Sequence, residues 1–570
     1  MSEQVEQTLA GAFSHYKNGK YDVAEQWVGN ILAPNPFHVR ALHLGAMIAA
    51  ERKDIKTALA RLQTAMGKAP KDPELYNTLG NVHLKNSDAT RAEMAFNGAI
   101  NIASDMIAPR QNLAFMLLRE NQPAEALTHF DTLVKMQPDN ANFAIGRIYA
   151  LKDSGQAAAA SSALDALGEG RMNKGQGALL KTQLAADMGQ VDKTAAHARS
   201  AYLENDALGA QALSVAVQSM AMSGDAAGAL STAFEALGED RSGVRIVAAA
   251  GKALDDLGHR EDSAKALISG AAKFDNAPEI LAAQAQIALG AGNASKAYEM
   301  SRQALSTCPG DLSIMPIFAR AALASGHIED AMVAAHSALA VTPNDQFWIA
   351  VKATAGRLKG QDYSYYYNYD KFVRVYDLSA PAGYDDIAAF NAALSKALGK
   401  LHNYKSAPLD QSLRFGTQTH QDLRFSNDPV ITAFFRAIDA PIRDYMDTVG
   451  QAPVHPLTRR NSGNYRLAGA WSVRLTAGGH HVNHVHPQGW VSSSYYVDVP
   501  DEVADAKTKS GWIGFGAPPL DIPAIAIPEK IIQPKPGRLV LFPSYMWHGT
   551  LPISGDQPRL TLPFDVVPAP

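Results

Sequence analysis

A 34-residue period runs through about the first 345 residues and constrains the fold more than any other feature of the chain. Alanine recurs in steps of 34 residues, with one step of 35 and one doubled step, at Ala24, Ala58, Ala92, Ala126, Ala160, Ala195, Ala229, Ala297 and Ala331. Two further series keep the same phase: Gly19, Gly155, Gly189, Gly224, Gly258, Gly292 and Gly326, and Pro70, Pro138, Pro309 and Pro343. A fixed period of this length indicates a structural unit repeated along the chain.

The repeated unit is predicted to be a pair of helices. Small residues let two helices approach closely, the glycine position supplies the turn between them, and proline ends the second helix. In the unit that begins at Pro73, Gly80 falls in the first helix, and Ala92 and Phe96 fall in the second. A generic Ala-rich helical bundle is the alternative, although a bundle has no reason to keep one phase over so many units.

This pattern resembles the tetratricopeptide repeat family, with about ten units over residues 5–345. The units between about 145 and 275 are degenerate and rich in alanine. Each unit of such a solenoid packs on its neighbours, and the array leaves a curved groove. The resemblance therefore implies that a repeat domain, residues 1–350, holds a peptide or protein. The partner in the groove is a substrate, a regulator or another copy of the chain, and the sequence leaves this choice and the oligomeric state open.

Composition and charge narrow the class of protein. Hydrophobic residues make up 46% of the chain and charged residues 19%, which is typical of globular proteins. The net charge of −4 gives no electrostatic reason to expect a nucleic acid or a membrane as partner. One cysteine, Cys308, excludes an intramolecular disulfide framework. The acidic start of the chain and the absence of a run of ~18 apolar residues predict a cytoplasmic protein without a signal peptide.

The period stops after Pro343, and a different pattern follows. Residues 361–370 contain five tyrosines, within a Tyr-rich junction assigned to 351–375. An aromatic wedge that packs the last repeat helix against the next domain is the favoured interpretation, and a ligand-stacking cluster is the alternative. The remaining residues, 376–570, are predicted to form the second domain.

The second domain combines helices with short strands. Residues 385–403 and 428–449 have amphipathic helical patterns, and a β core is expected over 464–567 because hydrophobicity alternates there. The predicted strands are Trp471–Leu475, Trp490–Val497, Arg538–Phe542 and Arg559–Leu562. Between them, residues 517–536 contain six prolines and are expected to form an extended loop. The predicted class is multidomain α + β: an α-helical solenoid followed by a sandwich or jelly roll with flanking helices.

Histidines concentrate between the first two predicted strands. Four of the 17 histidines lie within seven residues, at His480, His481, His484 and His486, and His548 follows a later apolar strand. Side chains two apart in a strand point to the same face, so His484 and His486 offer two imidazoles to one point. His548 supplies a third. Three protein ligands with open positions are typical of a catalytic metal site, and imidazole suits iron, zinc, copper or nickel.

Arg559 and Thr561 add an anion clamp to this predicted metal site. They share one face of the final strand, where a guanidinium group and a hydroxyl group bind a carboxylate well. A metal site beside a carboxylate anchor predicts a small anionic co-substrate that chelates the metal at its other end. 2-Oxoglutarate fits this description.

Residues 464–567 resemble the catalytic core of the Fe(II)/2-oxoglutarate-dependent oxygenases. The motifs are His484-Val-His486-Pro487, Ser493-Ser-Tyr495-Tyr496 and Phe542-Pro-Ser-Tyr-Met-Trp-His548, and Leu413–His420 resembles the helical lead-in to the core. The resemblance implies a double-stranded β-helix, with His484, His486 and His548 as metal ligands and Arg559 with Thr561 as the co-substrate anchor. It also implies a hydrogen bond from Tyr496 to the co-substrate.

The chain departs from the family pattern at one ligand. The family has a carboxylate where this chain has His486, so the site has either three histidine ligands or two, with His486 or a neighbour in a supporting role. His480, His481 and Trp490 are expected to support the ligands or face the substrate, and surface histidines are the alternative for the first two.

The expected activity is that of a dioxygenase that uses Fe(II), 2-oxoglutarate and O2, with ascorbate as reductant. The fused repeats suggest that it hydroxylates a protein or peptide substrate. Two alternatives stay open: a cupin-like metalloenzyme with three histidine ligands that does not use 2-oxoglutarate, and a non-catalytic repeat scaffold.

Overall fold

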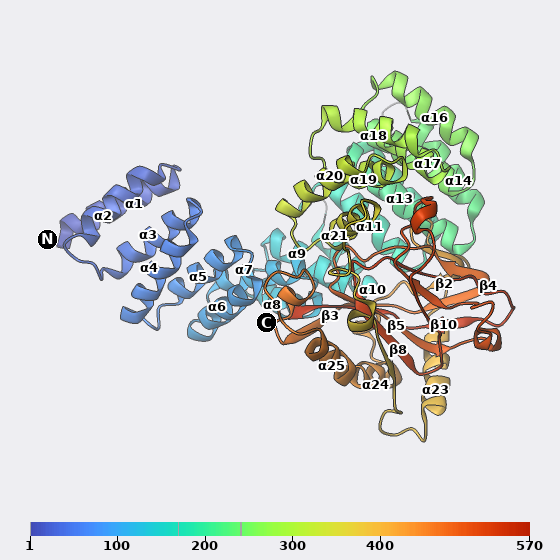
Figure 1. Cartoon of the computed structure of the whole chain (residues 1–570). Coiled ribbons are helices and arrows are strands. Elements are labelled where there is room, and N and C mark those ends of the chain that lie inside the picture. Colours follow the sequence, from blue (N-terminus) through green and yellow to red (C-terminus); the bar gives the residue numbers. More distant parts are fainter. Residues whose placement is uncertain (1, 169, 240–241, 570) are drawn as a thin grey trace. The chain divides into compact units, whose positions relative to one another are not determined.

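The computed structural model describes residues 2–168, 170–239 and 242–569. The chain divides into two compact units, one that ends at Arg171 and one that begins at Met172. Helices come first along the chain and antiparallel strands come last (Figure 1), which confirms the predicted class of a repeat-like solenoid followed by a β region. Within the described ranges, no helix is both long enough and apolar enough to cross a membrane.

The first unit consists of helix pairs. Its helices are α1 (Ser2–Lys17), α2 (Tyr21–Leu32), α3 (Val39–Glu51), α4 (Ile55–Lys68), α5 (Pro73–Lys85), α6 (Ala89–Ile102), α7 (Ile107–Arg119), α8 (Pro123–Met136), α9 (Ala141–Asp153) and α10 (Ala157–Leu167). Small residues lie where the paired helices touch, since a methyl group added at Gly80 would overlap the ring of Phe96. The predicted turn position has a left-handed backbone in every pair of this unit: φ is +71° at Gly19 and +77° at Gly155, and non-glycine residues adopt it at Lys53, Ser87 and Asn121.

The second unit begins with the same kind of helix pairs. They are α11 (Lys174–Asp187), α12 (Val191–Glu204), α13 (Asp206–Ser223), α14 (Ala226–Gly238), α15 (Val244–Asp256), α16 (Arg260–Lys273), α17 (Pro278–Gly290), α18 (Ala294–Thr307), α19 (Met315–Ala324) and α20 (Ile328–Val341), followed by α21 (Gln346–Leu358). These helices belong to the same compact unit as the β region. The expected domain boundaries near 350 and 376 stay a prediction.

Two antiparallel sheets form the β region. The strands are β1 (Arg374–Asp377), β2 (Leu413–Gln418), β3 (Asn464–Ala470), β4 (Val473–His481), β5 (Val491–Asp498), β6 (Ile513–Phe515), β7 (Lys530–Ile532), β8 (Arg538–Pro543), β9 (His548–Thr550), β10 (Arg559–Thr561) and β11 (Phe564–Ala569). The larger sheet has the order β1-β8-β5-β10-β4-β2, with β11 joining β3 to β5, and the smaller sheet has the order β7-β6-β9. Two antiparallel sheets agree with the expected sandwich, and the jelly-roll topology stays a prediction.

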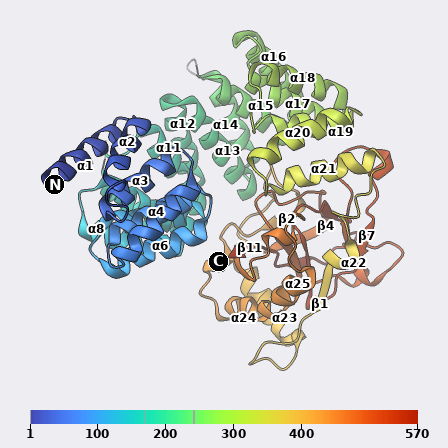
Figure 2. The same cartoon turned by 60° about the vertical axis from the view of Figure 1, so that its left-hand side comes forward.

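Helices cover one face of the larger sheet. Helices α23 (Ile387–Gly399), α24 (Pro429–Ala437) and α25 (Asp439–Val449) lie along it in both views (Figures 1 and 2), and a short helix, α22 (Tyr369–Phe372), precedes β1. The ring of Phe434 lies 4.8 Å from that of Tyr495 on β5. Buried side chains of the three helices and of the sheet thus share one apolar core.

The tyrosines of the junction pack against the β region. The hydroxyl groups of Tyr363 and Tyr369 donate hydrogen bonds to Glu529, and the hydroxyl group of Tyr545 donates one to the carbonyl oxygen of Tyr366. Burial raises the pKa of Tyr367. These contacts favour the aromatic wedge over a ligand-stacking cluster.

The structure corrects two local expectations. Leu413–His420 is not helical: Leu413–Gln418 is the edge strand β2, because it pairs with β4, and a bulge with φ of +51° at Phe415 interrupts the pairing. The proline-rich segment 517–536 is not simply an extended loop: it is largely irregular, Pro523–Ile525 forms a 3-10 helix, and Lys530–Ile532 forms the short strand β7 on β6. Both strands depend on a distant partner strand, which local patterns do not reveal.

The tight contacts between paired helices give a testable stability difference. Gly146→Ala is expected to lower the free energy of unfolding by about 1–3 kcal/mol, because the added methyl group overlaps the buried ring of Phe130. Gly29→Ala in α2 is the matched control, since nothing lies within 4 Å of its added methyl group. It is expected to raise the same free energy by about 0.5–1 kcal/mol. Urea unfolding followed by circular dichroism measures both, and equal effects would contradict the packing described.

Candidate metal centre

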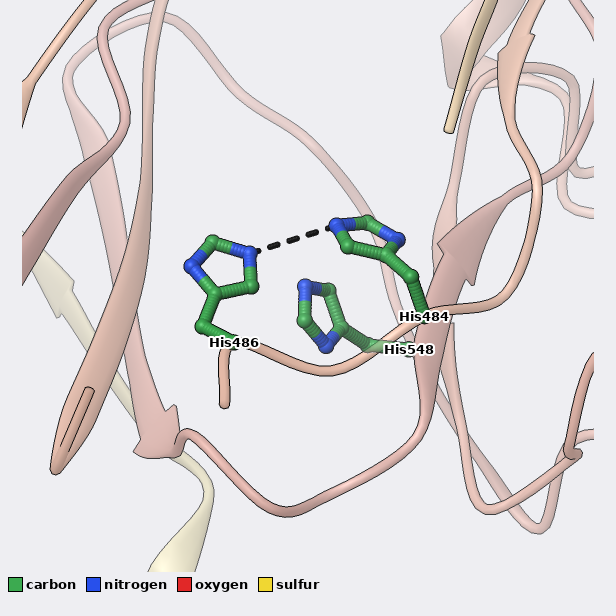
Figure 3. Close-up of side chains that lie close together, drawn as sticks. All are labelled: His484, His486 and His548. Carbon is green, nitrogen blue, oxygen red and sulfur yellow. Dashed lines mark hydrogen bonds between the residues drawn. The ribbon is translucent and has the colours of Figure 1, made fainter. Parts of the chain in front are cut away.

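Three imidazoles converge at one point between the two sheets. His548 opens β9 of the smaller sheet, and His484 forms an isolated antiparallel bridge with it, in which the two residues exchange both backbone hydrogen bonds. His486, two residues later, faces the same way. One ring nitrogen of each histidine lies within 4.8 Å of the other two (Figure 3). Val485 between them is buried and lines the same cavity.

The outer nitrogen of each ring is fixed by a hydrogen bond. The Nδ1 atoms of His484 and His548 lie 2.9 Å from the carbonyl oxygens of Val482 and Met546. The Nδ1 atom of His486 lies 2.8 and 2.7 Å from the two carboxylate oxygens of Asp565. All of these partners are acceptors, so each Nδ1 carries the hydrogen and each Nε2 of a neutral ring presents a lone pair.

The inner nitrogens of His484 and His486 face one another at hydrogen-bond distance (Figure 3). The Nε2 atoms of His484 and His486 are 3.2 Å apart. Burial, together with His486, lowers the pKa of His484 to about 3, and burial with His484 lowers the pKa of His548 well below its ordinary value. The rings of these two residues are therefore neutral at pH 7. Three oriented imidazoles whose inner nitrogens converge are the donor set that a divalent transition metal requires, so the residues fit such an ion.

A chain of hydrogen bonds continues from the Nδ1 atom of His486 through Asp565. The hydroxyl group of Ser492 on β5 donates to Asp565 Oδ1 at 2.7 Å and lies 2.8 Å from the hydroxyl group of Ser544. Asp565 itself lies on β11. A carboxylate that accepts from the outer nitrogen of a ligand fixes the direction of the ring and makes its inner nitrogen more basic.

A cavity of about 600 Å³ adjoins the three imidazoles. The smaller sheet contributes Ile513 and β9 to its wall, and the larger sheet contributes residues of β5, β8, β10 and β11. Arg559 and Thr561 both line it, while Leu560 between them is buried on the other side in the apolar core. The predicted alternation of Arg559 and Thr561 is thus present, on β10, which is followed by one further strand, β11.

Arg559 is a buried cation without a carboxylate partner. Only 2% of its surface is exposed, and its guanidinium group donates to the carbonyl oxygen of Gly511 and lies 5.5 Å from the Tyr496 ring. Its Nε atom has no hydrogen-bond partner, and no ion pair among the described residues involves it. Burial lowers its pKa. Because a buried charge is strongly destabilising unless it is paired, this arrangement points to an anion in the cavity.

The other predicted site residues take different places. His481 lines the cavity, with its ring 5.8 Å from that of His484 and its Nδ1 atom 3.0 Å from the Ser412 hydroxyl group. Tyr496 is fully buried against Arg559, and its hydroxyl group has no hydrogen-bond partner in the described part of the chain. His480 and Trp490 do not line the cavity. Trp490 packs in the core, and its indole donates to the carbonyl oxygen of Leu457.

Two residues at the site escaped the sequence analysis. Asp565 carries the carboxylate that orients His486, and Trp471 lines the cavity with its ring 5.8 Å from the ring of His486. Neither stands in a spaced motif. The one available signal for Asp565 was an acidic residue in an otherwise apolar final strand, Phe564-Asp565-Val566-Val567.

Removing the Asp565 carboxylate tests the supporting role that the geometry gives it. Asp565→Ala is expected to weaken the binding of Co²⁺ by about 10–100-fold, because the ring of His486 loses its orienting partner. Asp498→Ala is the control, since that carboxylate is exposed at the end of the neighbouring strand β5. Calorimetric titration of both variants checks the difference, and equal affinities would mean that Asp565 has no influence on the metal.

Two stretches of the chain match sequence models of known families. Residues 469–565 match the family described as "Putative 2OG-Fe(II) oxygenase", and residues 116–171 match the tetratricopeptide repeat. No curated protein matches the chain.

Several solved structures are similar to parts of the chain at low identity. PilF from Pseudomonas aeruginosa is 16% identical, covers 35% of this chain and 90% of its own, and has a TM-score of 0.31. A tetratricopeptide repeat protein from Parabacteroides merdae is 15% identical, covers 49% of this chain and 97% of its own, and has a TM-score of 0.32. MamA from Desulfovibrio magneticus is 22% identical, covers 24% of this chain and 77% of its own, and has a TM-score of 0.22. The chain therefore contains, in this order, a stretch that matches the tetratricopeptide repeat (residues 116–171) and a stretch that matches the family described as "Putative 2OG-Fe(II) oxygenase" (residues 469–565).

Proposed function

We propose that this protein is an Fe(II)- and 2-oxoglutarate-dependent dioxygenase that hydroxylates a protein or peptide substrate recruited by its repeats. The observation that carries the proposal is the pairing, in one cavity, of three converging imidazoles with a buried arginine that lacks a carboxylate. 2-Oxoglutarate has a keto acid for a metal at one end and a carboxylate for an arginine at the other.

In this proposal, His484, His486 and His548 hold Fe(II) through their Nε2 atoms. When bound, iron and 2-oxoglutarate supply an oxidation in which 2-oxoglutarate loses CO2 to become succinate and one atom of O2 enters a C–H bond of the substrate. The hydrogen bonds at the three Nδ1 atoms keep the rings aimed at one point. Three neutral ligands leave the centre one unit more positive than a site with a carboxylate ligand, and the carboxylate of Asp565 behind His486 offsets part of that charge.

Arg559 and Thr561 hold the distal carboxylate of 2-oxoglutarate. The carbonyl oxygen of Gly511 fixes one side of the guanidinium group, and the Tyr496 ring covers another. The Nε–H of Arg559 is a buried polar group that such an anion would satisfy, and Tyr496, which does not line the cavity, is proposed to support the guanidinium group. His481 lines the same cavity and faces the co-substrate in this arrangement.

The substrate enters past side chains that are polar or aromatic. Asp410, Gln411, Gln418 and Trp471 line the cavity together with the ligands. The 600 Å³ cavity has room for a side chain beside 2-oxoglutarate. The repeat region, assigned to residues 1–350, is proposed to bring the substrate chain to this cavity, since repeats of this type generally mediate protein interactions.

Loss of the anchor separates this function from a metalloenzyme that does not use 2-oxoglutarate. Arg559→Ala is expected to weaken 2-oxoglutarate binding by about 2–5 kcal/mol, at least about 30-fold in Kd, because a buried charge-assisted contact is lost. Release of succinate, assayed with Fe(II) and ascorbate, should fall accordingly. Arg443→Ala is the control, since it removes an exposed arginine paired with Asp439. Metal binding by the wild type without any affinity for 2-oxoglutarate would favour the cupin-like alternative.

The substrate proposal has its own test. Proteins captured by full-length His548→Ala are incubated with wild-type protein, Fe(II), 2-oxoglutarate and ascorbate. We expect mass spectrometry to find one captured protein heavier by one oxygen atom, with no such product when Arg559→Ala replaces the wild type. Captured partners that stay unmodified while succinate is released would contradict recruitment of the substrate by the repeats.

A further inference from the structure

Helix α21 belongs to two hydrophobic cores. Trp348, Val351 and Ala355 pack in the core that α21 shares with α18–α20, and Ile349 and Ala353 pack in the core of the β region. Figure 2 shows α21 directly beside the β region. A helix buried on both sides has little freedom to shift, so its position is set by the two cores together.

Helix α21 forms hydrogen bonds with two of the residues that adjoin the histidine ligands in the sequence. The backbone N–H of Gln346, in the first turn, donates to the carbonyl oxygen of Pro487 at 2.9 Å. The indole N–H of Trp547 donates to the hydroxyl oxygen of Thr354 at 2.9 Å. Pro487 follows His486, and Trp547 precedes His548. Both contacts therefore act one peptide bond away from a ligand.

Trp547 is also held through its backbone. Its carbonyl oxygen accepts from the N–H of Gly516 at 2.8 Å, and the carbonyl oxygen of Gly516 accepts from Arg357 on α21 at 2.9 Å. The side chain of Trp547 is 3% exposed, and its ring lies edge-on to that of Phe347, with the centroids 6.3 Å apart. The residue before His548 is thus fixed from α21 on both its side chain and its main chain.

Helix α21 consequently connects the segment that carries His486 with the segment that carries His548. Gln346 and Thr354 are eight residues apart on the helix, a distance of about 12 Å. Because a helix changes its length very little, contacts at these two positions fix the separation of Pro487 and Trp547. His484 needs no such tie, since it is paired with the backbone of His548.

We infer that α21 sets the spacing of His486 and His548, with Thr354 as a positioning residue that acts through Trp547. The helix that directly follows the repeat series is then part of the metal centre, and a displacement of the adjoining helices changes the geometry of that centre. The inference rests on the proposed function only in requiring that the three histidines bind a metal ion.

The test uses full-length protein and Co²⁺ alone, without 2-oxoglutarate or substrate. Thr354→Val keeps the shape of the side chain but leaves the buried indole N–H without an acceptor. We expect it to raise the Kd for Co²⁺ about tenfold, at the lower end for residues that support ligands, and to shift the visible absorption of the bound ion. Thr354→Ser restores the hydroxyl group. It should return the Kd for Co²⁺ to within about twofold of the wild-type value and restore the wild-type absorption.

A matched control comes from α11. Thr182 is buried like Thr354, and each donates to the carbonyl oxygen four residues earlier at 2.8 Å, but Thr182 has no tryptophan partner. Thr182→Val should leave the Kd and the absorption unchanged. Trp547→Phe removes the same hydrogen bond from the other side. It should raise the Kd as well, with no further increase when combined with Thr354→Val.

Each outcome decides between the two proposals. If wild-type protein binds Co²⁺ and Thr354→Val and Trp547→Phe behave like Thr182→Val, the positioning role is wrong and the metal site stands. If His548→Ala binds Co²⁺ as tightly as the wild type, the metal site itself is wrong. A change in thermal stability with wild-type affinity and absorption would reduce Thr354 to a packing role and overturn the inference. If Thr354→Val does not fold, Trp547→Phe alone tests the inference, through the Kd for Co²⁺ and the absorption of the bound ion.

Discussion

The chemistry of the β region depends on where three imidazole hydrogens lie. Hydrogen bonds to two carbonyl oxygens and one carboxylate hold these hydrogens at Nδ1, on the outside of the cluster. The Nε2 atoms are then left on the inside, where those of His484 and His486 are 3.2 Å apart. Exchanging the tautomer of one ring would place a hydrogen inside and abolish the donor set. The bridge between His484 and His548 and the strand that carries Asp565 therefore matter to function through the orientation that they impose.

Two of the contacts between the helices of the second unit and the β region lead to the cavity. On one side, α21 holds the neighbours of two ligands. On the other, the segment before β2 lies on α13, where Lys405 and Ser406 donate to the carbonyl oxygens of Met222 and Ala221. A few residues later the same segment supplies Asp410, Gln411 and Ser412 to the cavity wall. Helices that a repeat pattern assigns to partner binding thus also shape the cavity.

Much of the architecture could be predicted because its signals are local. The left-handed turns at Lys53, Ser87 and Asn121 follow from the repeat phase, and the pairing of His484 with His486 follows from alternation in an extended segment. The prediction of Arg559 and Thr561 on one face used the same rule, and both line the cavity.

What could not be predicted depends on distant partners. Nothing near Asp565 in the sequence identifies His486 as its partner, 79 residues away. β2 exists because β4 is beside it, and Trp490 was placed by its closeness in sequence to the ligands whereas its ring turns into the core. The double role of α21 is likewise invisible in the sequence, because both of its apolar faces pack on residues that are distant along the chain.

The sharing of α21 between two cores has a consequence for how such a chain can evolve. A catalytic domain that is joined by a loose linker can be exchanged between proteins or separated by proteolysis with its core intact. Here, a cut before residue 376 would strip Ile349, Ala350 and Ala353 from the core of the β region and expose the apolar surface that they cover. The β region and the helices immediately before it are therefore expected to be inherited together, while the first unit, which ends at Arg171, is free to vary in length and sequence.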